Sequence, residues 1–331
     1  CEEMVVCVAQ NANDASGGHC CAFNAPGTYG RSYTQQRGQD TREDAYLYGL
    51  NIQEQWDYAL QCDPDLIFVT GLKHIGWHPA RPYYPFAFPD QFDWERSRDI
   101  EPVKAWGDKG DAYYIQLVDN IRRYKGVSES QAVSQPRSFR IGRFDGWDGV
   151  SPDFRHYPGN TMHRNHKGHA NMFYTNTTGR NDIVDAKVAR DRRYVYFYVE
   201  TADKLTPSTD RNWMMLFIDV DRDKATGWEG YDFVLNYEKP QDGKSVLSRH
   251  SGDGWNWERA AEADYAVDGN RMEIRIPRSL LGEFGKSLNI EFKWSDNMQE
   301  EGNIMDFYVN GDAAPGGRFN FVYDERAGQN R

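Results

Sequence analysis

Residues 214–233 read Met-Met-Leu-Phe-Ile-Asp-Val-Asp-Arg-Asp-Lys-Ala-Thr-Gly-Trp-Glu-Gly-Tyr-Asp-Phe, and this stretch decides the fold of the second half of the chain. It begins with a continuous apolar run, which is typical of a buried strand. Carboxylates then occupy alternate positions, at Asp219, Asp221 and Asp223. Because side chains two apart in an extended strand point the same way, these three acids share one face. We expect a strand, an acidic loop and a return strand over residues 231–237.

The acidic loop is a candidate metal site. Carboxylates this close repel one another unless a cation or basic side chains lie among them, and Ca²⁺ prefers the oxygen ligands of such loops. The spacing fits the first three ligands of an EF-hand, but Lys224 stands where that loop needs Gly, and Gly230 where it needs Glu. The loop is therefore not an EF-hand. Two alternatives stay open, a bound metal ion or a solvated turn whose acids are balanced by Arg222 and Lys224.

The composition argues against two classes of partner. The chain has 331 residues and a net charge of −11, whereas nucleic-acid binders present a basic face. No apolar run approaches the roughly 18 residues of a membrane span. Aromatic residues make up 14 % of the chain, with 10 Trp and 20 Tyr. This content suits either a surface that stacks on sugars or the packed cores of β-sheets.

The first part of the chain has an α/β pattern. Residues 4–8 and 66–71 are short apolar runs of the kind found in strands that are buried on both faces. Between them, residues 51–60 place Ile52, Trp56 and Leu60 on one face of a helix, and residues 111–124 return as a second helix. The order strand, helix, strand is the unit of a parallel sheet.

The composition changes after residue 124. From 125 to 136 the chain turns to Ser, Gln, Glu and Val without periodicity, which marks a domain boundary. Beyond it, alternating strand patterns and Asp-Gly turn signals predict a β-sandwich. We therefore divide the chain into residues 1–126, a linker at 127–136 and a sandwich at 137–331.

Residues 49–56 (Gly-Leu-Asn-Ile-Gln-Glu-Gln-Trp) and 63–71 (Asp-Pro-Asp-Leu-Ile-Phe-Val-Thr-Gly) resemble the later part of a (β/α)₈ barrel. The barrels in question are glycoside hydrolases of the endo-α-mannosidase-like group, family 99-like, and residues 92–102 and 113–124 are similar to them as well. The resemblance covers about the first 125 residues, half of the length that a barrel needs. It implies a partial (β/α)₈ barrel, its C-terminal half, followed by an all-β sandwich. It also implies that a missing upstream barrel segment packs against the two strands.

The resemblance points to a catalytic region that departs from the group. There the Val-Thr-Gly strand runs into Trp-Asn-Glu-Trp, whose Glu works at the glycosidic bond. Residues 72–75 here read Leu-Lys-His-Ile, so His74 stands where the acid is expected. A paired-carboxylate mechanism needs two acids, and Asp93 and Glu95 are the candidate substitutes. The alternative is that these acids pair with neighbouring Arg and Lys side chains to hold the loop. His74 and Trp77 are candidates for a sugar subsite.

From residue 139 onward the chain is similar to family 9-like carbohydrate-binding modules, a β-sandwich type appended to glycosidases. The resemblance rests on residues 144–150 (Phe-Asp-Gly-Trp-Asp-Gly-Val), 186–197, the acidic loop at 219–232, and 272–281. The family implies structural calcium and an aromatic clamp for a sugar. On this chain the calcium ligands would be Asp219, Asp221 and Asp232, with Asp223 in reserve. The candidate sugar-binding rings, by location alone, are Trp228, Trp255 and Trp257, each of which would equally serve to cap the sandwich edge.

Three functions follow. The first is part of a secreted bacterial glycoside hydrolase, periplasmic or at the cell surface, that binds an oligo- or polysaccharide and calcium. The second is a non-catalytic glycan-binding protein or pseudo-enzyme that has lost the barrel's acid. The third is a redox module with haem or a transition metal, for which the candidate ligands are His156, Met162, His163, His166 and His169.

Overall fold

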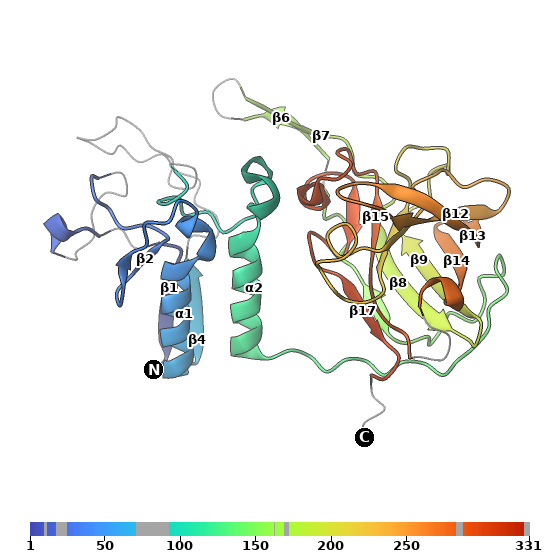
Figure 1. The fold of residues 1–331 in the computed structure, drawn as a ribbon, viewed down its shortest axis with the longest axis horizontal. Helices are drawn as coiled ribbons and strands as arrows, with labels where there is room; N and C mark the ends of the chain where they lie inside the picture. Colours follow the sequence, from blue (N-terminus) through green and yellow to red (C-terminus); the bar gives the residue numbers. More distant parts are fainter. Residues whose placement is uncertain are drawn as a thin grey trace. The chain divides into compact units, whose positions relative to one another are not determined.

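The computed structural model describes residues 1–9, 12–17, 25–70, 93–161, 163–168, 172–282 and 287–327. The chain divides into two compact units, Cys1–Ser128 and Glu129–Arg331, and each is described by itself. Figure 1 traces both along the sequence.

The first unit is a small α/β structure. Its strands β1 (Glu3–Cys7) and β4 (Leu66–Thr70) pair in parallel, and the helix α1 (Leu50–Cys62) connects them. The helix α2 (Ala112–Lys125) completes the core, in which Val6, Ile52, Trp56 and Leu117 are buried together. The remaining elements are the strands β2 (Tyr33–Thr34) and β3 (Gly38–Gln39) and the 3₁₀ helices η1 (Asp14–Ser16), η2 (Ala45–Tyr48) and η3 (Lys104–Lys109).

The predicted (β/α)₈ half-barrel is wrong. The parallel strands described in this unit are a single pair, and they are covered by helices on one face only. On the other face Val5, Leu66 and Phe68 are 56, 52 and 54 % exposed, and no described residue covers them. A barrel strand has to bury both faces. The apolar runs suggested such strands because a run of apolar residues does not reveal whether one face or both are covered.

The second unit is built on one large antiparallel sheet. Its strand order is β16-β15-β10-β11-β12-β13-β14-β9-β8-β5, and β17 also pairs with β15. The bounds are β5 Asp153–Arg155, β8 Ile183–Arg190, β9 Tyr194–Thr201, β10 Met215–Asp219, β11 Phe233–Leu235, β12 Lys244–His250, β13 Trp257–Asp268, β14 Arg271–Pro277, β15 Asn289–Asp296, β16 Asp312–Ala314 and β17 Phe321–Asp324. Two 3₁₀ helices, η4 (Arg278–Leu280) and η5 (Ile304–Tyr308), lie between strands.

This sheet curls so that strands far apart in its order enclose a common core. The rings of Phe197 on β9 and Phe292 on β15 meet edge to face, with centroids 5.7 Å apart, although these strands are not neighbours. Leu216 and Ile218 of β10 point into this core, whereas Met215 and Phe217 belong to a second cluster on the opposite face of the strand. Because both faces of β10 are covered, its sequence is a continuous apolar run.

A separate two-stranded hairpin leaves the curled sheet. It consists of β6 (Arg164–Lys167) and β7 (Phe173–Asn176), which pair with each other and with no other described strand. Figure 1 shows it extending away from the rest of the second unit.

Candidate metal centre

Three carboxylates meet where β10 ends and β11 begins. Asp219, Asp221 and Asp232 each offer an oxygen, and these oxygens all lie within 4.8 Å of one another. The antiparallel register that pairs Ile218 with Phe233 sets Asp219 and Asp232 beside each other at the strand ends. The side chain of Asp219 is fully buried, that of Asp232 is half-buried and that of Asp221 is exposed. The arrangement is one that could hold a metal ion.

Hydrogen-bond donors of the same loop already contact the buried Asp219. The Lys224 Nζ donates to Asp219 Oδ2 at 2.7 Å and to Glu291 Oε2 at 2.6 Å, and the Arg222 backbone N–H donates to Asp219 Oδ1. Gly230 makes room for this lysine, since a Cβ at that position would lie 2.7 Å from the Lys224 Cδ. The aliphatic part of the Lys224 side chain therefore fills the space beside Gly230, the position at which an EF-hand has its glutamate.

The pKa values of two of these carboxyl groups, Asp219 and Asp232, are raised. Burial raises the pKa of Asp219, although the Lys224 ammonium acts in the opposite direction. Burial also raises the pKa of Asp232, and the charges of Asp221 and Asp219 add to the effect. A raised pKa means that ionisation of these carboxyl groups is less favourable in the folded protein than in the unfolded chain. Lys224 therefore compensates the acids only in part, and a divalent cation would relieve the remaining repulsion.

The fourth predicted ligand lies apart from this group. Asp223 is exposed, and its Oδ1 accepts from the Ala225 backbone N–H at 2.9 Å. Asp221 likewise accepts from the Asp223 N–H and from the Thr226 hydroxyl, so both side chains help to hold the turn. The structure thus brings together three of the four acids that the sequence suggested. Glu291, a member of the same ion-pair network, was missed because it lies on β15, nearly 70 residues further along the chain.

The three candidate sugar-binding tryptophans belong to the aromatic cluster on the outer face of β10. Trp228 is only 5 % exposed and packs edge to face on Trp255, with ring centroids 4.4 Å apart. Trp255 and Trp257 are half-buried in the same cluster. A ring as buried as Trp228 offers no face to a sugar, whereas Trp255 reaches Tyr237 at the edge of the cluster, with centroids 6.0 Å apart.

Tyr237 lines a hollow at the other end of β10 and β11 from the acidic triad. The hollow has a volume of about 250 Å³ and is lined mostly by polar side chains, namely Ser208, Asp210, Arg211, Asn212, Trp213, Asn236, Tyr237, Lys239, Pro240 and Glu301. Trp213 is buried beneath it and donates from Nε1 to the Thr206 carbonyl. Sequence reasoning missed this hollow, because its walls come from three loops with no shared pattern.

The candidate catalytic acids of the first unit both have local partners. Asp93 Oδ2 lies 2.6 Å from Arg96 Nη1, and its Oδ1 accepts from the Arg96 backbone N–H. Glu95 accepts from the Ser32 backbone N–H at 2.9 Å and from Gln39 Nε2 at 2.8 Å. These contacts tie residues 93–97 to the turn that contains β2 and β3. His74 and Trp77 fall in the segment 71–92, outside the described residues.

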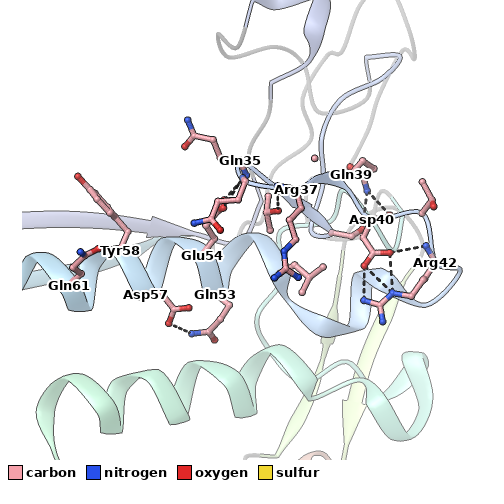
Figure 2. A pocket seen from close by; sticks show the side chains of 16 residues that line it. Gln35, Arg37, Gln39, Asp40, Arg42, Gln53, Glu54, Asp57, Tyr58 and Gln61 are labelled. Atoms are coloured by element: carbon pink, nitrogen blue, oxygen red, sulfur yellow. Dashed lines mark hydrogen bonds and ion pairs between the residues drawn. The ribbon is translucent and has the colours of Figure 1, made fainter.

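The same turn forms one wall of a groove against α1 (Figure 2). The groove has a volume of about 790 Å³, and its lining includes the amide side chains of Gln35, Gln39, Gln53 and Gln61. Glu54 holds the turn in place by accepting from the Gln35 backbone N–H at 2.7 Å. The groove also carries the acids Asp40, Glu54 and Asp57 (Figure 2), of which Asp40 is paired with Arg42 and Asp57 with Arg123.

The candidate haem or transition-metal ligands do not form a described cluster. His156 Nδ1 lies 3.2 Å from the Ile183 carbonyl oxygen beside β8, while His166 is on the hairpin strand β6. Met162 and His169 lie outside the described residues. Within the described part of the chain, neither helix has both the length and the apolar character that crossing a membrane requires.

Comparisons with known proteins identify no relative of this chain. No family model matches the chain, and searches of curated proteins and of solved structures return no match.

Proposed function

We propose that the chain is a non-catalytic glycan-binding protein whose second unit binds calcium at Asp219, Asp221 and Asp232. The observation that carries the proposal is the convergence of three carboxylate oxygens at the end of two adjacent strands. Hard cations such as calcium take carboxylate and carbonyl oxygens in irregular loops. The raised pKa values of Asp219 and Asp232 support it, because the fold retains acids there that lack full compensation.

The glycan would bind in the hollow beside Tyr237. Sugar-binding sites combine an aromatic face with polar side chains that exchange hydrogen bonds with hydroxyl groups. Tyr237 supplies the ring, backed by Trp255, and Asp210, Arg211 and Asn212 supply donors and acceptors on one wall. The calcium would act at a distance, by holding the ends of β10 and β11 together.

The contacts of the candidate acids in the first unit support binding without hydrolysis. Asp93 is paired with Arg96, and Glu95 with Ser32 and Gln39, so both acids serve to fasten a loop. We place the protein outside the cytoplasm of a bacterium, in the periplasm or at the cell surface, since extracellular calcium modules operate at calcium concentrations of about 0.1 to 1 mM.

The test is retention of the full chain on a panel of neutral polysaccharides. We expect Tyr237→Ala to weaken retention about tenfold, since losing one ring contact removes roughly 1–2 kcal/mol. Tyr157→Ala is the matched control, because that ring is 85 % exposed and belongs to a different segment. Retention by no member of the panel, or equal loss in both variants, would contradict the proposed site.

A further inference from the structure

The hairpin β6–β7 presents an unusually open surface. Every residue of its two strands is exposed except Asn176, which is half-buried and donates to the Val309 carbonyl at the hairpin base. Met172, Phe173 and Tyr174 are 53, 56 and 43 % exposed. A two-stranded hairpin with no third strand gains little from packing in water. Exposed apolar side chains that gather in one place mark a binding surface more often than single ones do.

The segment that contains the hairpin lacks acidic residues, whereas the chain as a whole is negatively charged. The protein has 50 Asp and Glu residues, yet none lies between residues 154 and 181. This segment holds four Arg or Lys residues and four of the eight histidines. Two of the cations, Arg155 and Arg180, are paired with acids outside the segment. Arg164 and Lys167 make no ion pair with any described residue, so the hairpin displays positive charge on an acidic protein.

The register places an aromatic ring directly across from a cationic or imidazole side chain on each face. His166 stands opposite Tyr174, with ring centroids 5.6 Å apart, and Lys167 stands opposite Phe173. Directly opposed side chains in an antiparallel pair are about 5 Å apart, comparable to the width of one sugar ring. Arg164 lies on the same face of β6 as His166, two residues before it. A ring that stacks on a sugar and a cation that meets its carboxylate or sulfate form the combination that an acidic saccharide requires.

We propose that this hairpin binds an anionic polysaccharide, a chain of uronic or sulfated sugars. The inference rests on the proposed glycan-binding function and adds a second, charge-selective surface to it. Nucleic acid is a poorer fit, because its phosphates follow every 1.7 Å of duplex and the chain as a whole carries a charge of −11. A polyuronate bears one charge per sugar and leaves an apolar ring face between charges, which matches the alternation of cation and ring.

The test compares polygalacturonate with its fully methyl-esterified form, which has the same backbone without the charge. We expect the full chain at low salt to bind the charged polymer at least about tenfold more tightly. The double variant Arg164→Gln/Lys167→Gln should lose this preference, and Tyr174→Ala should weaken binding to the charged polymer. Arg259→Gln is the matched control, an exposed arginine of the same unit on β13. Because the hairpin residues are exposed, thermal melting should be unchanged in all of these variants.

Several results would overturn the inference. These are equal binding to both polymers, an unchanged preference in the double variant, or equally tight binding of single-stranded DNA. A change of oligomeric state in sedimentation, with no change in polymer binding, would assign the hairpin to a second copy of the chain instead. Loss of neutral-glycan retention in Tyr237→Ala tests the proposed function separately, so a failure there and a failure here are distinguishable.

Discussion

Calcium should raise the melting temperature of the second unit by an amount that follows from mass action. A ligand that binds only the native state stabilises it by RT ln(1 + [L]/Kd). With a dissociation constant of about 0.1–1 mM, as in extracellular calcium modules, 10 mM calcium adds roughly 1.4–2.7 kcal/mol. For a unit of about 200 residues each kcal/mol is worth about 2–4 °C, so the expected shift is about 3–11 °C.

The assay is thermal unfolding of the full chain followed by tryptophan fluorescence in EGTA or in calcium. Trp228 reports on the loop, because it lies next to Tyr231, with ring centroids 5.9 Å apart. Asp232→Asn should abolish the shift. Asp223→Asn is the matched control, since that acid lies on the same loop outside the triad and its amide retains the acceptor for the Ala225 N–H.

Lys224→Met separates the two ways of neutralising the triad. Without calcium this variant should melt lower than the parent, because the buried Asp219 loses its hydrogen-bonded partner. With calcium its shift should exceed that of the parent, because the ammonium no longer competes for the carboxylate. Identical melting of the parent chain in EGTA and in 10 mM calcium would refute the reasoning and leave Lys224 as the permanent counter-ion.

Three further predictions concern the buried charges of the curled sheet. Burial raises the pKa of Asp185 to about 7, so the folded state binds more protons than the unfolded one between pH 4 and 7. The stability of the parent should therefore fall as pH rises through that window, and Asp185→Asn should melt higher than the parent at pH 8 but not at pH 4.5; parallel melting curves would contradict this. Burial lowers the pKa of Lys293, whose Nζ donates to the Pro315 carbonyl. Lys293→Met should therefore raise the stability to urea at pH 7 by about 1–3 kcal/mol, an advantage that shrinks above pH 10. A loss of stability would show that the hydrogen bond to Pro315 outweighs the cost of burying the ammonium group. Glu273→Ala should lower the free energy of unfolding by about 2–4 kcal/mol, because the buried Trp147 Nε1–H, which donates to Glu273 at 2.7 Å, would lose its acceptor. Glu262→Ala, at an exposed position, is the control, and equal effects of the two substitutions would contradict the reasoning.

The acidic corner was predictable because its determinants are local. Asp219 and Asp221 directly follow an apolar run, and the nearby return strand brings Asp232 back to them. The strand period did not extend to Asp223, because β10 ends at Asp219 and the chain turns there. The tryptophans were not predictable in the same way. Whether Trp228 is buried depends on which loops fold over β10, and those loops include residues 255–257 and η5, which are distant in sequence. The hollow beside Tyr237 depends on distant loops for the same reason.

The sequence by itself determined the strand periodicity, the position of the helices α1 and α2 and the gathering of three carboxylates, since each depends on residues within one or two neighbouring elements. Only the tertiary structure decided that β1 and β4 form the single parallel pair among the described strands of this unit and not part of a barrel, because apolar residues look alike whether one face of a strand is covered or both. It also decided that Glu291 joins the ion pair of Lys224 and Asp219. Such a contact follows from strand order in the curled sheet, which pairs β10 with β15 across more than 60 residues of chain.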